Sequence, residues 1–200
     1  MTQLGLFDDG ALHPAGEGRA ALARVRLDAR AWVEHRPGWL AGHEALLDAL
    51  RRGIEWRTEH RAMYDAFVEV PRLTATLPDD GPCPPALARA HRALERRYGR
   101  RFESVRLAWY RDGRDSVAMH GDRIGRRIAD TIVAILSLGA PRRFLLKPAA
   151  GGRSHRFDLG GGDLLVMGGA CQRTWRHGIP KARSAGPRIS IQFRERRYDD

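Results

Sequence analysis

Hydrophobic and polar positions in the first half of the chain follow a helical periodicity in two places. Residues 42–52 and 86–98 carry apolar side chains three and four positions apart. This spacing gathers the apolar side chains on one face of a helix. Gly53 and Gly99 follow these segments, and glycine commonly ends a helix because it adopts the left-handed conformation without strain. We therefore predict two amphipathic helices.

Other segments of the first half lack the helical spacing. Residues 27–33 and 70–76 are predicted to be extended, and a short strand is predicted to begin at Ile54. Pro71 has no N–H to donate, so we expect its segment to avoid a central position in a sheet. Residues 1–16 show no periodicity and are predicted to form a loosely tethered arm.

From residue 102 onward, short extended segments replace the helical pattern. Turns rich in glycine or proline separate them, as at residues 160–162 and 186–187. Eight segments are predicted to be strands: 102–110, 116–120, 131–138, 143–147, 156–159, 163–167, 174–177 and 188–194. Many short strands separated by such turns predict a double-sheet jelly roll or a barrel. We expect a mainly β protein with flanking helices (α+β), in which the helices pack on the outside of the sheets.

Composition bounds the size and the partners of the protein. The 200 residues, 42% of them hydrophobic, suit one domain with a real core, which we place at residues 17–200. The net charge of +11 suits a polyanionic partner such as nucleic acid. Of the 35 basic residues, 33 are arginine. A bias in composition therefore explains the charge about as well as a nucleic-acid partner does.

Targeting signals and cysteine usage indicate an intracellular protein. No run approaches the roughly 18 apolar residues of a membrane span, and the start of the chain lacks the basic region of a signal peptide. We expect a cytoplasmic protein without membrane contact. Cys83 and Cys171 form no Cys-x-x-Cys motif and are expected to be reduced thiols. Nothing in the sequence contradicts a monomer.

The tripeptide His120-Gly121-Asp122 is the first candidate for metal binding. In an extended segment, the side chains at positions i and i+2 point to the same face. His177 lies 55 residues after Asp122, on another predicted strand. Two histidines and one carboxylate form the facial triad typical of non-haem Fe(II), which leaves coordination positions open for a co-substrate and oxygen. The alternative is that these histidines are structural.

The last predicted strand has an unusual polar face. Arg188, Ser190, Gln192 and Arg194 share one face, and the intervening residues of the other face are apolar and predicted to be core. Two arginines facing inward are costly unless anions pair with them. Their Cα atoms are separated by roughly 20 Å, so two inward-leaning side chains leave a gap that fits a small dicarboxylate. The alternative is a solvated face with ordinary surface charge.

Six motifs in this order resemble the AlkB family of Fe(II)/2-oxoglutarate-dependent dioxygenases, which repair alkylated nucleobases. The resemblance runs from about residue 4 to Arg194, and the combination is far more specific than any single motif. It also implies that residues 17–101 form a helical, nucleotide-facing part and that residues 102–196 form the jelly-roll core. The motifs are Tyr110–Gly113, His120–Asp122, Ile135–Gly139, Gly162–Gly169, Trp175–Lys181 and Arg188–Arg194.

The resemblance implies a role for each matching residue. His120, Asp122 and His177 match the iron ligands. Among the residues that match the 2-oxoglutarate site, Arg188 pairs with the distal carboxylate beside Tyr110, and Arg194 lies near the keto-acid end. Ser190 is expected to contact the same co-substrate. Arg72, Arg156 and Trp109 are assigned to the substrate.

Three departures from the family pattern affect these expectations. Ala108 stands where relatives carry an asparagine that hydrogen-bonds 2-oxoglutarate, so one anchor is missing. Ser190 stands where relatives often carry another asparagine. Residues 123–127 are a basic run in place of acidic residues that touch the substrate in relatives. These departures concern the contacts with co-substrate and substrate and leave the expected iron ligands unchanged.

The resemblance implies O2-dependent oxidative dealkylation of N-alkylated bases, such as 1-methyladenine and 3-methylcytosine, in DNA or in RNA. Fe(II) and 2-oxoglutarate are the expected cofactor and co-substrate. One alternative keeps both but acts on another target, such as tRNA or a protein side chain. A second alternative is a basic nucleic-acid-binding module that has lost catalysis.

Overall fold

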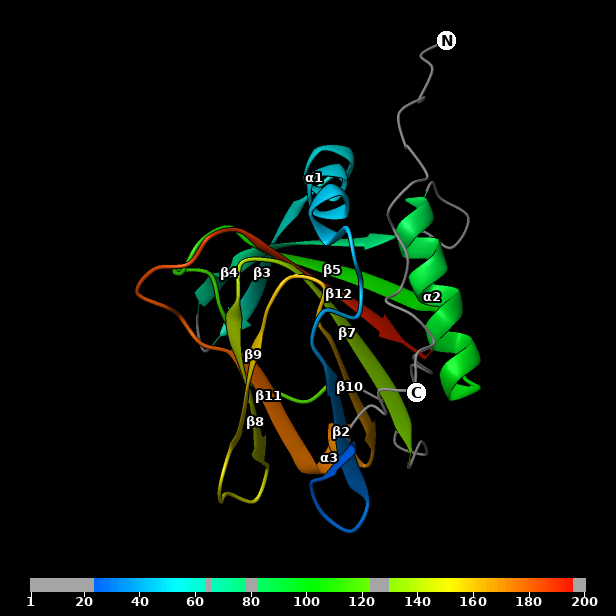
Figure 1. Cartoon of the computed structure of the whole chain (residues 1–200). Helices are drawn as coiled ribbons and strands as arrows, with labels where there is room; N and C mark the ends of the chain where they lie inside the picture. The colour runs from blue at the N-terminus through cyan, green and yellow to red at the C-terminus, as the bar shows by residue number, and fades with distance from the viewer. Residues whose placement is uncertain (1–23, 64–65, 78–82, 123–129, 196–200) are drawn as a thin grey trace.

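The computed structural model describes residues 24–63, 66–77, 83–122 and 130–195, which form two facing antiparallel sheets (Figure 1). The larger sheet has the strand order β1 (Arg24–Arg26), β2 (Ala31–Arg36), β10 (Leu164–Gly169), β7 (Thr131–Gly139), β12 (Arg188–Arg194), β5 (Ser104–Tyr110), β4 (Ala66–Leu77) and β3 (Arg57–Met63). The smaller sheet has the order β6 (Val117–His120), β11 (Trp175–Ile179), β8 (Arg142–Pro148) and β9 (His155–Leu159). This is the predicted jelly roll.

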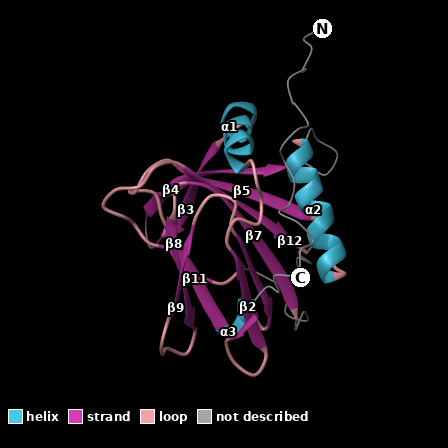
Figure 2. Ribbon diagram, in the orientation of Figure 1, coloured by secondary structure: helices cyan, strands magenta, loops and turns pink. Residues whose placement is uncertain are grey.

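Three helices accompany the sheets in the described part of the chain (Figure 2): α1 (His43–Gly53), α2 (Pro85–Tyr98) and α3 (Cys171–Thr174). The two longer ones confirm the predicted helices. Gly99 ends α2 in the left-handed conformation, with φ of 61°, and its N–H donates to the Glu95 carbonyl at 2.9 Å. None of these helices is long and apolar enough to cross a membrane.

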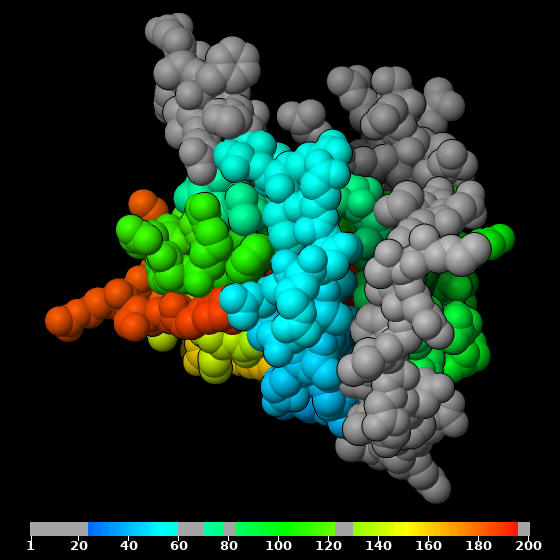
Figure 3. Space-filling view, turned by 90° about the horizontal axis from the view of Figure 1, so that it is seen from above, coloured from blue at the N-terminus to red at the C-terminus, as the bar shows by residue number. Residues whose placement is uncertain are grey.

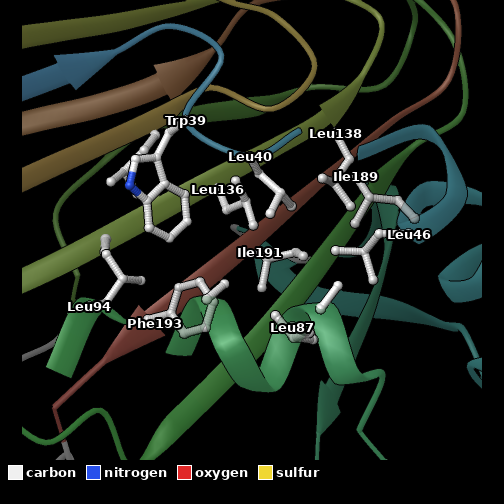
Figure 4. Close-up of a cluster of buried hydrophobic side chains, with 14 of the residues drawn as sticks. Trp39, Leu40, Leu46, Leu87, Leu94, Leu136, Leu138, Ile189, Ile191 and Phe193 are labelled. Carbon is white, nitrogen blue, oxygen red and sulfur yellow. The ribbon is translucent and has the colours of Figure 1, made fainter. Parts of the chain in front are cut away.

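A first hydrophobic core lies between the two long helices and the outer face of the larger sheet (Figure 4). Leu46 of α1 and Leu87 and Leu94 of α2 are buried in it. The apolar faces predicted from helical spacing are therefore what holds the helices against the sheet. The sheet contributes alternate residues of its strands, among them Leu136, Leu138, Ile189, Ile191 and Phe193.

A second core lies between the two sheets, and β7 contributes to both cores. Ile132, Ala134 and Leu136 belong to the outer core, whereas Val133 and Ile135 belong to the inner one. Because both of its faces are covered, this strand is a continuous apolar run.

The strand β12 confirms the predicted alternation. Ile189, Ile191 and Phe193 are fully buried in the outer core. The face with Arg188 and Arg194 therefore points between the sheets, and Arg188 is only 1% exposed. The alternative of a solvated arginine face is wrong.

The extended segment predicted at 27–33 is partly wrong, because it spans the turn between β1 and β2. Asp28 makes this turn: its carboxylate accepts the N–H groups of Arg30 and Ala31 at 2.7 and 2.8 Å. A side chain that satisfies backbone donors in this way favours a turn over a strand.

The edge position predicted from Pro71 is wrong, because β4 lies between β3 and β5. The pairing of β4 with β3 shifts register between Thr58 and His60, and its pairing with β5 begins only at Leu73. Pro71 therefore sits at an irregularity where no ladder N–H is required. The predicted start of β3 is also early, since the strand begins at Arg57.

Two predictions lie outside the described residues: the arm at 1–16 and the basic run at 123–127.

Candidate functional site

A cavity of about 630 Å³ lies between the two sheets. The polar face of β12 forms one wall, through Arg188, Ser190, Gln192 and Arg194. His120 and His177 of the smaller sheet line it as well. The sequence motifs that predict metal and anion binding thus meet in one place.

Three side chains form a candidate metal site in this cavity. His120 ends β6, and His177 lies directly opposite it on β11. With Asp122, which follows β6 by two residues, they bring one ligand atom each to within 4.8 Å of one another. The alternation expected for His120-Gly121-Asp122 and the pairing of two distant strands together produce this cluster.

The histidines are held in the form that binds metal. Nδ1 of His120 lies 2.8 Å from the Ala118 carbonyl, and because a carbonyl only accepts, this nitrogen carries the proton and Nε2 keeps its lone pair. Burial lowers the pKa of His120 and lowers the pKa of His177 to about 3. Both imidazoles are therefore neutral at physiological pH. The ring of His177 also stacks on Phe144, with ring centroids 5.6 Å apart.

Asp122 is held as a carboxylate. Burial raises its pKa, but the opposite charge of Arg194 and its hydrogen bonds outweigh burial and hold the pKa at about 2. Arg194 donates through Nε and Nη2 to the two carboxylate oxygens at 2.9 and 3.0 Å. A carboxylate has about four lone-pair sites, so this fork leaves acceptor capacity for a metal.

A further residue, Gln172, positions this carboxylate. It is buried in α3, and its Oε1 accepts the backbone N–H of Asp122 at 3.1 Å. Gly121 permits this approach, because a Cβ there would lie 2.6 Å from the Gln172 carbonyl oxygen. No sequence motif points to Gln172, because residues 171–173 lie between two predicted strands and carry no predicted role.

Arg188 is the most unusual group in the cavity. Its Nε donates to Ser137 Oγ at 2.9 Å, but among the described residues neither terminal nitrogen has a hydrogen-bond partner. Burial lowers its pKa to about 10, so it remains a cation at pH 7. Its guanidinium carbon lies 5.2 Å from the centroid of the Tyr110 ring. A buried cation with unpaired donors is costly unless an anion binds it.

Arg142 holds the turn after β5 and the segment before β12 together. Its guanidinium donates to the carbonyls of Asp112, Asp115 and Pro180 at 2.8–3.0 Å. Ala182 N–H also donates to Gly113 at 2.7 Å. Seen from above, the turn after β5 (green) rests against the segment before β12 (orange) (Figure 3). Tyr110 and Arg188, which border these segments, are held in place as a result.

The comparison with protein families agrees with this geometry. The family model described as the 2OG-Fe(II) oxygenase superfamily matches residues 49–194. The chain belongs to this superfamily. Oxygenases of this superfamily use Fe(II), 2-oxoglutarate and O2.

Relatives place this oxygenase in the AlkB group. Human alpha-ketoglutarate-dependent dioxygenase alkB homolog 3 is 30% identical over 182 residues, which cover 79% of this chain and 64% of that protein. The mouse DNA oxidative demethylase ALKBH2 is 28% identical over 171 residues, covering 73% and 72%. The chain is thus an AlkB-like oxygenase that spans somewhat less than two thirds of the human relative's length.

Solved structures share the fold of this oxygenase. OsALKBH1 superimposes with a TM-score of 0.55 at 17% identity, covering 86% of this chain and 100% of that chain. A prolyl hydroxylase from Trichoplax adhaerens gives a TM-score of 0.59 at 11% identity, with coverages of 82% and 83%. At these identities the likeness concerns the jelly roll alone.

The residues present fit the cofactors of the superfamily. The neutral histidines and ionised Asp122 are a donor set suited to Fe(II). The two terminal nitrogens of Arg188, which have no partner in the described part of the chain, suit a carboxylate, because a guanidinium fork binds carboxylates with two parallel hydrogen bonds. Ser190 and Tyr110 line the same cavity.

The three residues assigned to the substrate have different surroundings. Arg72 lines the cavity, is buried, and makes one long hydrogen bond of 3.4 Å to the Ser116 carbonyl. Arg156 is exposed on β9, on the outer face of the smaller sheet, and is not brought into the cavity. Its contact with a nucleic-acid backbone stays a prediction.

The assignment of Trp109 to the substrate is corrected by the structure. Its indole ring packs against Trp56 in the outer core, with ring centroids 5.4 Å apart. Ala108 and Tyr110 line the cavity, and the alternation of a strand therefore turns Trp109 to the opposite face of β5.

Proposed function

We propose that this AlkB-like oxygenase binds Fe(II) through His120, Asp122 and His177 and removes N-linked alkyl groups from nucleobases in DNA. RNA is the second nucleic acid that the same chemistry accommodates. One observation carries the proposal: the buried Arg188, whose terminal nitrogens have no hydrogen-bond partner among the described residues, lines the same cavity as the His–Asp–His cluster. A dianionic co-substrate beside a metal accounts for both features.

The chain's own residues offer a binding site for each end of 2-oxoglutarate. Arg188, oriented by Ser137 and bordered by Tyr110, binds the distal carboxylate. Arg194 orients Asp122 and adds positive charge near the keto-acid end. The ionised Asp122 and the two neutral histidines leave open positions on the metal. When bound, Fe(II) would activate O2, which is the oxidant: it would oxidise 2-oxoglutarate to succinate and carbon dioxide and hydroxylate the alkyl carbon.

A nucleic-acid target is supported by charge as well as by relatives. Arg143, Lys147, Arg156 and Arg176 are exposed on the outer face of the smaller sheet. Lys147 pairs with Arg176 across β8 and β11, and Arg156 pairs with Leu145 between Arg143 and Lys147, so the four side chains share this face. We name these four residues the basic face. It suits the phosphates of a strand. Mouse ALKBH2, by its name a DNA oxidative demethylase, is 28% identical.

The proposal is tested with single-stranded oligonucleotides that carry 1-methyladenine or 3-methylcytosine. We expect release of formaldehyde and succinate and restoration of the unmodified base, which mass spectrometry of the oligonucleotide measures. The variant His177→Ala should release neither product and should not restore the base, while it keeps the circular dichroism of the folded protein.

Two other outcomes contradict the proposal in different ways. Turnover of 2-oxoglutarate without repair of either oligonucleotide would move the target to tRNA or a protein side chain. Salt-sensitive binding to oligonucleotides without succinate under any condition would indicate a binding module without catalysis.

A further inference from the structure

A second buried arginine lies near the Arg188 end of the cavity. Arg142 is 3% exposed and belongs to β8 of the smaller sheet, where its side chain shares the inner face with Phe144. Arg188 points inward from the larger sheet. The guanidinium carbons of Arg142 and Arg188 lie 5.6 and 5.2 Å from the centroid of the Tyr110 ring. Two buried cations from opposite sheets therefore converge on one tyrosine.

No ion pair neutralises the charge of Arg142 within the described residues. Its three hydrogen bonds go to backbone carbonyls. The two carboxylates nearby are held by other arginines, Asp115 by Arg111 and Asp112 by Arg114, each at 2.8 Å. A backbone carbonyl is a dipole without net charge. The carbonyls therefore orient the guanidinium of Arg142 and leave its positive charge to act at longer range.

Arg142 and Arg188 are close enough to repel each other. Burial lowers the pKa of Arg188, and repulsion from Arg142 lowers it further. The distances to the shared ring centroid place the two guanidinium carbons within about 11 Å of each other. Salt screens buried charges much less than exposed ones. An anion that binds Arg188 therefore relieves this repulsion and is attracted by both cations.

Arg142 lies far from the metal ligands. Along β8 it is four residues, or about 13 Å, from Leu146, and Leu146 pairs with His177 of β11. The charge of Arg142 therefore acts on the Arg188 end of the cavity more strongly than on the end with the metal cluster.

We propose that Arg142 is a positioning residue for 2-oxoglutarate, and that it strengthens binding of the distal carboxylate without touching it. In the described part of the chain, the residues that line the cavity do not include Arg142. It acts through its charge and through the turn that it holds beside Tyr110. This inference rests on the proposed function, which places the distal carboxylate at Arg188.

The test compares 2-oxoglutarate with 2-oxopentanoate, in which a methyl group replaces the distal carboxylate. The two compounds have the same keto-acid end, so both can chelate Fe(II). Anaerobic titration measures each dissociation constant through the visible absorption of the chelated keto acid, without turnover. The ratio of the two constants gives the preference of the protein for the distal carboxylate, and we expect the wild type to prefer 2-oxoglutarate.

Two variants separate the charge of Arg142 from its hydrogen bonds. Arg142→Gln removes the charge and keeps an amide that can donate to the carbonyls. We expect its preference for 2-oxoglutarate to fall about tenfold, because one of two buried cations is lost. Its affinity for 2-oxopentanoate should stay within about twofold of the wild type, since that compound has no distal charge. Arg142→Lys keeps the charge and should keep the preference within about threefold.

Arg183→Gln is the matched control. It removes the same charge from an exposed side chain next to Ala182, whose N–H donates to the Gly113 carbonyl in the same pair of segments. Neither dissociation constant should change. Urea unfolding compares the stability of the variants. If Arg142→Gln does not fold, Arg142→Lys decides: a preference kept supports the inference, and a preference lost contradicts it.

Two results would overturn the inference alone. Equal weakening of both keto acids in Arg142→Gln would show that Arg142 only supports the fold of the cavity. An unchanged preference would show that its charge does not reach the distal carboxylate. A wild type without preference for 2-oxoglutarate would also overturn the placement of that carboxylate at Arg188. Failure to repair methylated oligonucleotides, by contrast, would contradict the proposed target and leave the keto-acid results standing.

Discussion

At the scale of single residues, the site depends on charges that are buried and left for a ligand. Arg188 is a cation whose terminal nitrogens have no hydrogen-bond partner among the residues that the structure describes, and Ser137 and Tyr110 hold it. Asp122, by contrast, is held by two hydrogen bonds from Arg194 and keeps acceptor capacity for a metal. Arg188 therefore has donors left for an anionic ligand, whereas Asp122 is already positioned to ligate a metal.

Replacing Arg188 should have opposite effects on binding and on stability. Arg188→Met removes a buried charge, so we expect the ligand-free protein to gain about 1 kcal/mol of unfolding free energy. The affinity for 2-oxoglutarate should fall about thirtyfold or more, because its distal carboxylate loses a charged partner. Urea unfolding and anaerobic titration measure the two effects. Unchanged affinity for 2-oxoglutarate would remove Arg188 from the co-substrate site.

Ala108 is the second residue with a direct prediction. It is buried on the cavity wall, opposite Thr74 of β4 and Ser190 of β12. Ala108→Asn adds the amide that the resemblance to the AlkB family leads us to expect here, and one added hydrogen bond should tighten 2-oxoglutarate binding about threefold to tenfold. Ala108→Leu fills similar space without an amide and should not tighten it. A gain in neither variant would show that the wall around Ser190 has replaced the missing amide.

At the scale of elements, the metal cluster depends on the close approach of α3 to the segment after β6. Gln172 accepts the N–H of Asp122 across this contact, and Gly121 leaves the space for it. The elements meet through backbone, so the geometry of the cluster is set by packing as well as by its three ligands.

Gly121→Ala tests this contact. The added Cβ would lie 2.6 Å from the Gln172 carbonyl oxygen, so the segment must move. We expect the affinity for Mn(II), used in place of Fe(II), to fall about tenfold, as for other changes in groups that orient ligands. Gly53→Ala, where no atom lies within 4 Å of the added carbon, is the matched control. Equal affinities for Mn(II) in the two variants would contradict this role of α3.

Asp28 couples the first turn of the larger sheet to β11. Besides its two backbone donors, it accepts the indole N–H of Trp175 at 2.7 Å. The hydrogen bond from Arg30, followed by the one from Trp175, holds its pKa below the usual value. A carboxyl whose folded pKa is depressed stabilises the protein above its unfolded pKa, and this contribution is lost as pH falls through the folded pKa.

We therefore expect Asp28→Asn to destabilise the protein by about 1 kcal/mol at neutral pH. The difference from wild type should shrink as pH falls below about 4, the unfolded pKa of an aspartate. Urea unfolding at several pH values measures it. Asp158→Asn changes a 75%-exposed carboxylate on β9 and should have little effect. A difference that persists undiminished at pH 2 would rule out the carboxylate as its cause.

At the scale of the whole molecule, the two faces of the smaller sheet have different tasks. Its inner face contributes His120 and His177 to the cavity, and its outer face carries the basic face. A strand bound along the basic face would keep its phosphates on this side of the molecule while one base enters the cavity.

The double variant Lys147→Ala/Arg156→Ala should weaken binding of single-stranded DNA regardless of sequence. The slope of log affinity against log salt should become less negative by about 1.4, since each phosphate contact to a single strand contributes about 0.7. Arg92→Ala/Arg96→Ala removes the same charge from exposed positions of α2. Equal losses in the two double variants would mean that net charge, and not the basic face, attracts the strand.

The sequence predicted the parts of the site that depend on local periodicity. The alternation in β12 placed Arg188 and Arg194 inward, and the spacing in His120-Gly121-Asp122 placed both side chains on one face. The same alternation, applied to β5, would have turned Trp109 away from the cavity. The sequence therefore already contained the pattern that places Trp109 outside the cavity.

Other features depend on contacts that no local pattern encodes. Glu59 reaches Arg106 across 47 residues, through the packing of three strands. Gln172 acts through a four-residue helix between two predicted strands, and this helix was not predicted. Pro71 is accommodated by a shift in the register of β3. Each is a matter of tertiary packing, which overrides propensity.

Anaerobic titration with Fe(II) and 2-oxoglutarate tests the central claim most directly. Chelation of the keto acid by iron produces a weak visible charge-transfer band, which reports the metal and the co-substrate together. We expect this band in the wild type and its loss in His120→Ala. Absence of the band in folded wild-type protein, or its persistence in His120→Ala, would contradict the assignment of the site.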